Sequence, residues 1–279
     1  MGRIRCSDGI NRKFLQKVKK PIVPLTILKA LDHGGTKPLV SAALKTPNIC
    51  PMDDLKADAR ENVRRIAAEF ATRGDALGWF EALYKESAGN PDVIPWADLE
   101  PNHFFRTWAE KTGLKGNGRR ALVVGCGLGD DAKYLLDLGF KVTAFDISPT
   151  AIDWARKLHA GEDIAFEVAD IFHPPRGWLG AFDFVLEVYT IQPLPLEIRS
   201  GVIDAIAAFV GENGRLVVVS RGREDDVEPD ILPWPVSRRD LSRFEQNGLK
   251  QIDFVEMPAD EEDEPPRFVV EYIRQNRER

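Results

Sequence analysis

Three glycines and one carboxylate, set one helix apart, are the residues of this sequence best suited to hold a nucleoside. The apolar run 120–124 is followed at alternate positions by Gly125, Gly127 and Gly129, then by a helical pattern, and a second apolar run ends at Asp146. A strand, a glycine-rich turn, a helix and a second strand bring backbone N–H groups close to a ligand. The acid at the end of the second strand can accept hydrogen bonds from a ribose diol.

The charge beside these glycines indicates which nucleoside is bound. A dinucleotide site carries its third glycine one position later than Gly129, where this chain has Asp130, and Asp131 follows. Two carboxylates in the first turn of a helix suit the helix dipole but repel a pyrophosphate. S-adenosylmethionine has an adenosine, a sulfonium and an ammonium, and it has no phosphate. The sequence therefore predicts S-adenosylmethionine rather than NAD.

Residues 120–221 resemble the core of a class I S-adenosylmethionine-dependent methyltransferase. The stretch 124–129 is similar to the family's first motif, 145–148 to the acidic loop after its second strand, and 169–172 to the loop that binds the adenine. The resemblance places Asp146 on the ribose and Asp170 on the adenine amino group, although a turn or cap role for Asp170 is an alternative. In all it implies seven cofactor contacts in these loops: Gly125, Cys126, Gly127, Asp146, Ile147, Asp170 and Ile171.

The hydrophobic pattern and the resemblance together predict an α/β fold of three layers. The family arranges its strands as a mostly parallel, seven-stranded, Rossmann-like sheet in the order 3-2-1-4-5-7-6, with the last strand antiparallel. The irregular segment 221–235 is expected to form a roof over the acceptor pocket. The patterns place strands at 120–124, 142–146, 164–168, 182–189, 215–220, 250–257 and 268–273, and helices at 149–157, 196–209 and 237–246.

The composition is that of an ordinary globular protein. The chain has 279 residues, of which 43% are hydrophobic, and this length allows one large or two small domains. No apolar run approaches the ~20 residues that span a bilayer, so we expect no membrane partner. Cys6, Cys50 and Cys126 are too few for a disulfide framework, which favours a cytoplasmic location. The four histidines are scattered, and we expect no metal.

Charge divides the chain into two parts. Residues 1–51 carry a net charge of about +8, and the remainder carries about −14. An acidic domain is a poor nucleic-acid binder, because neutralisation of phosphates supplies most of that affinity. We therefore expect a small-molecule methyl acceptor and no nucleic acid. The oligomeric state, monomer or homodimer, stays open.

The predicted domain boundary lies at Met52. Three explanations of the basic extension 1–51 remain: a flexible arm, a targeting peptide without the usual Ser and Arg content, or a segment upstream of a natural start at Met52. Residues 52–279 are expected to form a single methyltransferase domain. Its first part, 52–112, carries helical patterns and corresponds to the position of the family's lid.

Two tryptophans narrow the resemblance. Trp79, after Gly78, and Trp96, after Pro95, are similar to residues in the branch of thiopurine, thiol and halide methyltransferases and, more loosely, of tellurite-resistance methyltransferases. In that branch, tryptophans close over the cofactor, and an aromatic face attracts a sulfonium by roughly 0.5–2 kcal/mol. Leu83 stands where the branch has a further tryptophan. The alternative is that both tryptophans pack in the core.

Three further residues receive roles from the same branch. Glu187, near the end of the strand 182–189, corresponds to an acid that faces the methionine ammonium. Tyr189 is a candidate catalytic residue near the transferred methyl, but the branch has its tyrosine directly after the acid. A slip of one residue turns a strand side chain to the other face, so the role requires that the strand has ended before Tyr189. Arg199 could attract an anionic acceptor, or could lie on a helix surface.

The chemistry needs little acid–base machinery, because the sulfonium is already a leaving group. Alignment of the acceptor with the methyl group in a dry pocket can supply ~7–11 kcal/mol. No general base is evident in the sequence, which favours a soft or anionic acceptor such as a thiol, a halide, or a tellurite or selenite species. A domain that binds the cofactor without turnover and an NAD-dependent oxidoreductase are the alternatives.

Overall fold

The computed structural model describes residues 51–259 and 264–275, with side chains from residue 58 onward. The predictions for the basic extension thus fall, up to residue 50, outside the described residues. The described part begins with the helical segment that was expected before the sheet. It contains α1 (Pro51–Ala71), α2 (Gly78–Glu86), the 3₁₀ turn η1 (Pro91–Val93) and α3 (His103–Thr112).

Local chemistry sets the ends of α3. The Asn102 side chain accepts hydrogen bonds from the backbone N–H groups of Phe104 and Phe105, as an N-cap does. Gly113 ends the helix in the left-handed conformation, at a φ of 64°, which costs glycine little. The helix therefore begins and ends where its sequence dictates.

The sheet is mostly parallel, as predicted, and contains one strand more than the seven expected. Its order is β3-β2-β1-β4-β5-β8-β7, and β8 runs antiparallel to both of its neighbours. The additional two-residue strand β6 (Val236–Ser237) pairs with the end of β5. The other strands are β1 (Arg120–Val124), β2 (Lys141–Asp146), β3 (Ile164–Val168), β4 (Phe182–Val188), β5 (Val210–Arg223), β7 (Leu249–Met257) and β8 (Arg267–Arg274).

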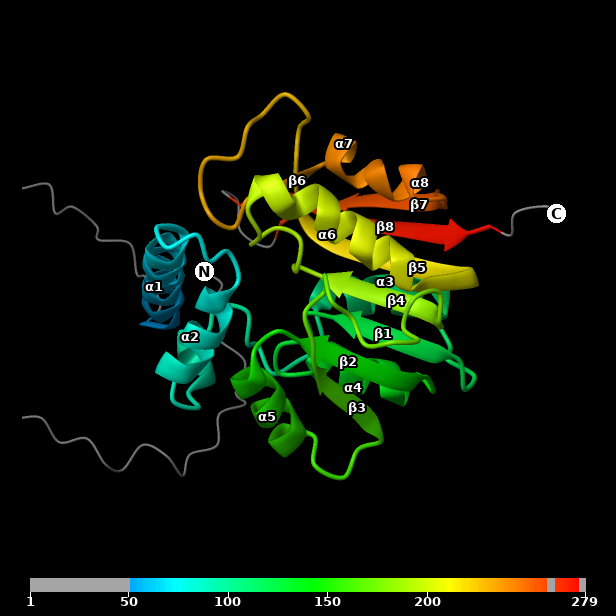
Figure 1. Cartoon of the computed structure of the whole chain (residues 1–279), viewed down its shortest axis with the longest axis horizontal. Coiled ribbons are helices and arrows are strands. Elements are labelled where there is room, and N and C mark those ends of the chain that lie inside the picture. The colour runs from blue at the N-terminus through cyan, green and yellow to red at the C-terminus, as the bar shows by residue number, and fades with distance from the viewer. Residues whose placement is uncertain (1–50, 260–263, 276–279) are drawn as a thin grey trace, which may run out of the picture. The chain divides into compact units, whose positions relative to one another are not determined.

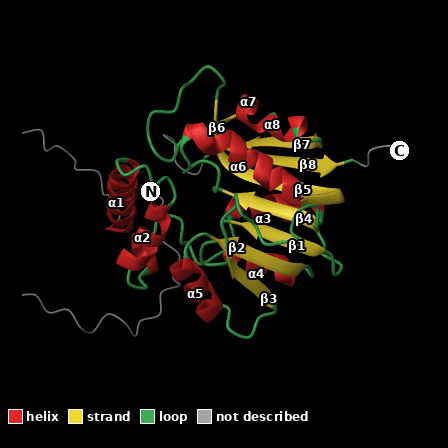
Figure 2. Cartoon of the chain, viewed as in Figure 1, coloured by secondary structure: helices red, strands yellow, loops and turns green. Residues whose placement is uncertain are grey.

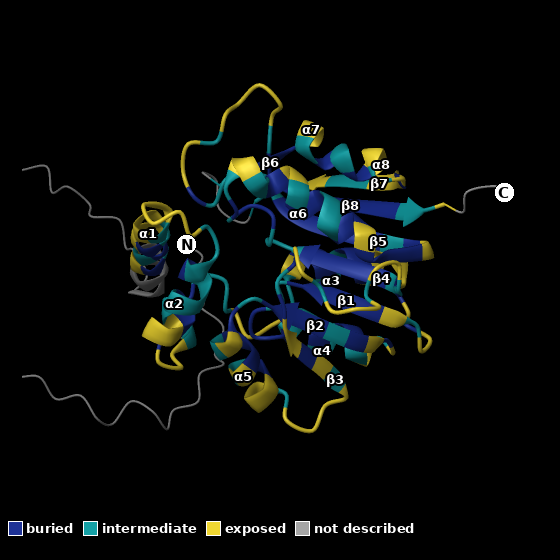
Figure 3. Cartoon of the chain, viewed as in Figure 1, coloured by how far each residue is buried: buried dark blue, intermediate teal, exposed yellow. Residues whose placement is uncertain are grey.

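Helices cover both faces of the sheet (Figures 1 and 2), and alternate residues of the strands pack against the two layers. Leu122 and Val124 of β1 belong to the cluster under α6 (Leu196–Phe209), α7 (Arg238–Leu241) and α8 (Arg243–Gln246). Ala121 and Val123 belong to the cluster on the other face. There α3, α4 (Asp130–Asp137) and α5 (Pro149–Leu158) cover the sheet. Strands β1, β4 and β8 are buried over most of their length because both faces are covered (Figure 3).

Two elements differ from the sequence prediction by more than a residue at an end. Strand β5 begins at Val210 instead of residue 215, and its register with β4 shifts between Phe182 and Phe184. Gly214 allows this irregularity, since a Cβ there would come within 2.8 Å of the Phe182 carbonyl oxygen. The helix expected at 237–246 is two short helices, α7 and α8, joined at Ser242. Its predicted start is confirmed, because Ser237 and Asp240 form a capping box.

Helices α1 and α2 lie beyond the carboxyl ends of the parallel strands (Figure 1). They share an apolar cluster with the roof segment, to which Ile66, Trp79 and Leu232 contribute buried side chains. The ligands of open α/β sheets bind at this edge, so the first helices and the roof lie on the side of the sheet where the site is expected. No helix in the described part of the chain is long and apolar enough to span a bilayer.

Candidate active site

The glycine turn between β1 and α4 adopts a backbone that other residues avoid. Gly125, Gly127 and Gly129 have φ values of 58°, 52° and 90°. A Cβ on Gly125 would lie 2.5 Å from Oγ1 of Thr190, in the loop after β4. Gly125 therefore packs against the carboxyl end of β4. The middle glycine, Gly127, lies next to Tyr84 of α2 instead.

Asp146 fastens the end of β2 to this turn. Its two carboxylate oxygens accept hydrogen bonds from the backbone N–H of Gly127 at 3.0 Å and of Ser148 at 2.9 Å. The side chain is only 8% exposed, and burial raises the pKa of its carboxyl group although these N–H groups oppose the shift. The acid stands at the end of the second strand, as predicted, and also shapes the turn itself.

A hydrogen-bonded aromatic pair covers Gly127. The indole Nε1 of Trp96 donates to the phenolic oxygen of Tyr84 at 2.9 Å, and a Cβ on Gly127 would lie 3.0 Å from that oxygen. Trp79 meets Trp96 edge to face, with 6.2 Å between ring centroids, and is 2% exposed. The structure thus brings the two predicted tryptophans together at the glycine turn. Tyr84 was missed in the sequence, where it looked like one more apolar residue of an amphipathic helix.

Glu81 connects α2 to the start of α5. Its carboxylate accepts hydrogen bonds from the Ser148 hydroxyl at 2.6 Å and from the Thr150 backbone N–H and hydroxyl at 3.1 and 2.8 Å. Burial alone would raise the pKa of Glu81, but these hydrogen bonds outweigh it and lower the pKa. An acid at a helix N-terminus is also favoured by the helix dipole. The sequence prediction missed this contact, because nothing local in the sequence pairs Glu81 with residues 148–150.

Glu187 is a fully buried carboxylate with one oxygen in use. Oε1 accepts the backbone N–H groups of Thr190 at 2.6 Å and of Ile191 at 3.0 Å. Oε2 has no hydrogen-bond partner among the described residues. Burial raises the pKa of Glu187 to about 7, against the effect of the two N–H groups. A buried oxygen without a partner is costly, and a cationic ligand would remove that cost.

Tyr189 lies beyond the end of its strand, as its predicted role requires. Strand β4 ends at Val188, and Tyr189 follows with a φ of 59°, so the chain is already turning. Its phenolic oxygen accepts a hydrogen bond from Nε of Arg267 at 3.0 Å. Its role in catalysis stays a prediction.

Asp170 and Ile171 follow β3, at the predicted edge of the sheet. The Asp170 carboxylate accepts the backbone N–H of Phe172 at 2.9 Å and contacts Nδ1 of His173 at 2.7 Å. Ile171 is buried beneath this turn, and Ile147 after β2 is half-buried. The local turn is therefore formed, and the adenine contact stays a prediction.

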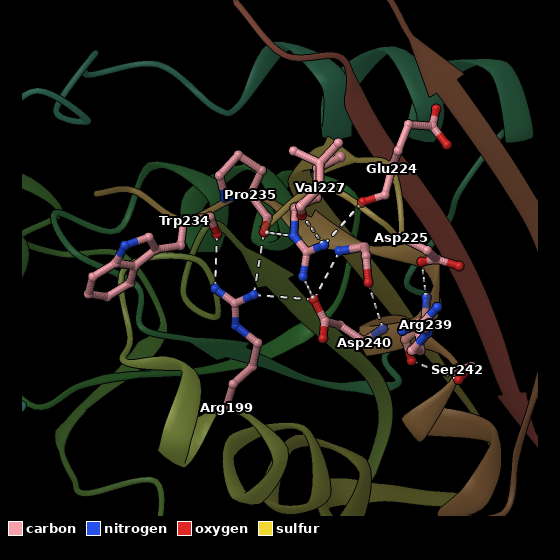
Figure 4. Close-up of polar contacts among 11 residues, drawn as sticks. Arg199, Glu224, Asp225, Val227, Trp234, Pro235, Arg239, Asp240 and Ser242 are labelled. Carbon is pink, nitrogen blue, oxygen red and sulfur yellow. Dashed lines mark hydrogen bonds and ion pairs between the residues drawn. The ribbon is translucent and has the colours of Figure 1, made fainter. Parts of the chain in front are cut away.

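Arg199 is not brought to the glycine turn. Its guanidinium is almost fully buried and donates to the backbone oxygens of Trp234 at 2.9 Å and Pro235 at 3.4 Å, and to Asp240 at 3.2 Å (Figure 4). Arg223 donates to the same Asp240 oxygen. These contacts hold the C-terminal end of the roof segment. The predicted attraction of an acceptor by Arg199 stays untested.

Comparison with known proteins agrees with this fold. The family description "Methyltransferase domain" matches residues 121–214. A curated relative, the 2-heptyl-1-hydroxyquinolin-4(1H)-one methyltransferase of Mycobacteroides abscessus, is 30% identical over 172 residues, which cover 58% of this chain and 72% of the relative. The chain therefore belongs to the class I S-adenosylmethionine-dependent methyltransferases, and S-adenosyl-L-methionine is its cofactor. The finer resemblance to the thiol and halide branch stays a prediction.

Solved structures show the same fold. A structure from work on the conversion of a disulfide bond into a thioacetal group during echinomycin biosynthesis is 25% identical, with a TM-score of 0.56, and the match covers 70% of this chain and 91% of that one. The N-methyltransferase NodS of Bradyrhizobium japonicum WM9, bound to S-adenosyl-L-homocysteine, is 18% identical, with a TM-score of 0.54. Its match covers 70% of this chain and 97% of NodS.

The residues at the carboxyl edge fit this cofactor. Glu187 offers a buried carboxylate oxygen that has no partner in the described part of the chain, which suits an ammonium. Gly127 leaves space below Tyr84 that a Cβ would fill, and the positive φ at this position favours glycine. Asp130 and Asp131 start α4 with carboxylates, which would repel a phosphate. Both acids have raised pKa values because they are buried, with Asp131 at about 7.

Proposed function

We propose that the chain methylates a small organic acceptor whose reacting heteroatom is soft or anionic, such as a thiolate or an ionised hydroxyl group. The observation that carries this proposal is the apolar cluster shared by the lid and the roof. Trp79 and Leu232 are buried in it, and Trp96 and Trp234 pack against it. Aromatic side chains favour an organic acceptor over a halide, tellurite or selenite ion. They give an organic molecule dispersion contacts and apolar burial, but they offer no group that binds an inorganic ion.

The proposed cofactor contacts follow the family positions. Asp146 and Ile147 hold the ribose, while Asp170 and Ile171 hold the adenine. The free oxygen of Glu187 accepts the ammonium, and the turn of Gly125, Cys126 and Gly127 contacts the amino-acid part. Trp79 and Trp96 close the lid side and exclude water. When bound, the cofactor supplies an electrophilic methyl group on a sulfonium.

The surroundings of Tyr189 support an acceptor that arrives ionised. The described polar partners of its hydroxyl are Arg267 and Asn102. An arginine cannot take a proton, and an amide is not a base. Burial raises the pKa of Tyr189 although Arg267 opposes the shift, so its phenol stays protonated near neutral pH. Tyr189 therefore donates a hydrogen bond to the acceptor and removes no proton from it.

The Mycobacteroides relative offers the first acceptor to test. By its name it methylates a quinolone that carries a 1-hydroxy group and a heptyl chain. Such a molecule combines a flat apolar body with an acidic hydroxyl group, which are the two features that the site of this chain supports. We therefore place 1-hydroxyquinolones and aromatic thiols first in an acceptor panel, with iodide and tellurite as the inorganic members.

The test is transfer of a labelled methyl group from the cofactor to this panel by the full chain. We expect turnover with at least one organic acceptor, and loss of turnover in Asp146→Ala. In calorimetry, Asp146→Ala should weaken S-adenosylhomocysteine binding by roughly 1.5–3 kcal/mol, as the loss of hydrogen bonds to a charged group does. Turnover of iodide or tellurite alone would contradict the organic acceptor.

A second candidate is a domain that binds the cofactor without transferring its methyl group. The [4+2]-cyclase SpnF shares the fold, with a TM-score of 0.53 and 16% identity over 62% of this chain and 80% of SpnF. The fold alone therefore does not establish transfer. Tight S-adenosylhomocysteine binding without turnover of any acceptor would favour this candidate, and binding of NAD instead would exclude both.

A further inference from the structure

Two arginines lie directly opposite one another at the carboxyl end of β5. Arg221 of β5 and Arg267 of β8 are partners in the antiparallel ladder. Both guanidinium groups pair with the same carboxylate, that of Glu264, and the distance from Arg221 is 3.1 Å. Arg60 of α1 reaches the same carboxylate at 3.2 Å. Three cations from three elements thus share one acid.

Within the described part of the chain, positive side chains outnumber negative ones in this cluster. Among the described residues, Glu264 is the only acid paired with these arginines, so this described group of four side chains carries two more positive charges than negative ones. The side chains of Arg221 and Arg267 are 20% and 6% exposed, so water screens them poorly. Burial and the neighbouring Arg267 lower the pKa of Arg221. Like charges directly opposite in a ladder are destabilising, which a further anion at this position would relieve.

The cluster borders the acceptor side of the site. Nε of Arg267 donates to the Tyr189 hydroxyl at 3.0 Å. The backbone N–H of Arg221 donates to the side chain of Gln192 at 2.8 Å, in the loop that follows β4. The Arg267 guanidinium also lies 5.6 Å from the centroid of the Phe104 ring. The positive charge therefore lies next to an aromatic ring and the predicted catalytic tyrosine.

We propose that Arg221, Arg267 and Arg60 form a subsite for an anionic oxygen group of the methyl acceptor, such as a carboxylate or an acidic hydroxyl group. Arg221 supplies free donors, since Glu264 is the only described side chain to which its guanidinium donates. Glu264 holds the three arginines together and competes with the ligand for them. Arg60 belongs to α1, so an anion bound here also draws the lid toward the sheet. The identity of the ligand as the acceptor rests on the proposed function, whereas its binding can be measured without turnover.

The test uses a matched pair of probes, quinoline-4-carboxylate and its neutral carboxamide. Calorimetry of the full chain, saturated with S-adenosylhomocysteine, measures the affinity for each. We expect the carboxylate to bind about tenfold more tightly than the carboxamide, and Arg221→Gln to remove most of this preference. Arg221→Lys, which keeps the charge and loses the planar fork, should keep part of it. Glu264→Gln should strengthen carboxylate binding, because it removes the competing acid.

Arg238→Gln is the matched control, since Arg238 pairs with Glu256 on the exposed surface of α7 and β7. It should leave the affinities for both probes unchanged. Equal binding of the two probes, no binding of the carboxylate at millimolar concentration, or an unchanged preference in a folded Arg221→Gln protein would overturn the subsite. A separate titration of S-adenosylhomocysteine into the same proteins, free of ligand, distinguishes this failure from failure of the proposed function, which requires cofactor binding whatever the probes do.

Discussion

The indole N–H of Trp96 donates to the phenolic oxygen of Tyr84 over a distance of 2.9 Å, directly above the middle glycine of the turn after β1. Tyr84 belongs to α2 and Trp96 to the loop that follows η1. The hydrogen bond therefore joins two separate parts of the lid at the point where the lid meets Gly127. Burial and the nearby Asp146 raise the pKa of Tyr84 well above its ordinary value, so its own hydroxyl hydrogen stays in place as a donor.

Tyr84→Phe should loosen the lid over the glycine turn. The variant keeps the ring but leaves the Trp96 indole N–H without its acceptor. We expect S-adenosylhomocysteine to bind about six- to tenfold more weakly, at the lower end of the ~1–3 kcal/mol cost of an unsatisfied buried group. Tyr134→Phe, on α4, is the control and should bind as the wild type does. Equal affinities in calorimetry would mean that the pair does not position the cofactor.

Gly127→Ala should block the cofactor without unfolding the chain. The added Cβ lies 3.0 Å from the Tyr84 oxygen, at a φ of 52°, so it adds a steric contact to a strained backbone. Gly113→Ala imposes a similar strain, at a φ of 64°, in open space. Both variants should lose about 1–2 kcal/mol of folding free energy, which thermal unfolding measures. Only Gly127→Ala should weaken S-adenosylhomocysteine binding by more than about tenfold, because only its Cβ contacts a lid residue, Tyr84.

Local sequence patterns predict much of the fold, but they predict only part of the candidate site. The strand run 120–124, its glycines and the acid at 146 are contiguous in sequence, so their pattern predicts a strand, a turn and a ribose-binding acid. The helix 196–209 and the Ser237 cap were predicted for the same reason. The irregular start of β5 was not, because it depends on how the strand meets Phe182 of β4.

The missed site residues make contacts across long sequence separations. Glu81 accepts hydrogen bonds from Ser148 and Thr150, which lie more than sixty residues later in the chain. Arg267 donates to Tyr189 and pairs with Glu264. A charged residue in an amphipathic pattern looks the same whether it faces water or a distant helix end. Sequence spacing identifies which loops share a sheet edge, and the tertiary contacts decide which of their side chains pair.

Glu81→Gln should weaken the attachment of α2 to α5. Glutamine keeps one acceptor oxygen but loses the charge that Ser148, Thr150 and the helix dipole favour. We expect faster hydrogen exchange in α2 and a loss of about 1 kcal/mol of stability, the usual size of one hydrogen bond. Glu86→Gln on the same helix removes an exposed pair with Arg65 and should change neither quantity. Unchanged exchange in Glu81→Gln would show that the lid is held by its apolar cluster alone.

Glu187 should make cofactor binding and stability respond to pH in opposite directions. Its pKa is raised by burial from 4.5 to about 7. The ionised form attracts an ammonium, so the affinity for S-adenosylhomocysteine should rise with pH, by up to about tenfold per unit below the folded pKa. For the free protein the sign is reversed. Since the folded pKa lies above the unfolded one, the favourable contribution of Glu187 to folding is fully present below about pH 4.5 and is lost as pH rises through about 7.

Glu187→Gln separates this effect from the other buried acids. Calorimetry between about pH 6 and 8 should give a flat affinity profile in the variant, with weaker binding than the wild type at the upper end, because the charge that responds to pH is gone. Asp131 also has a raised pKa of about 7, but its carboxylate accepts the backbone N–H of Asn102, so Asp131→Asn should keep the wild-type slope. A slope that survives in Glu187→Gln and disappears in Asp131→Asn would move the pH-sensitive contact from the end of β4 to the start of α4.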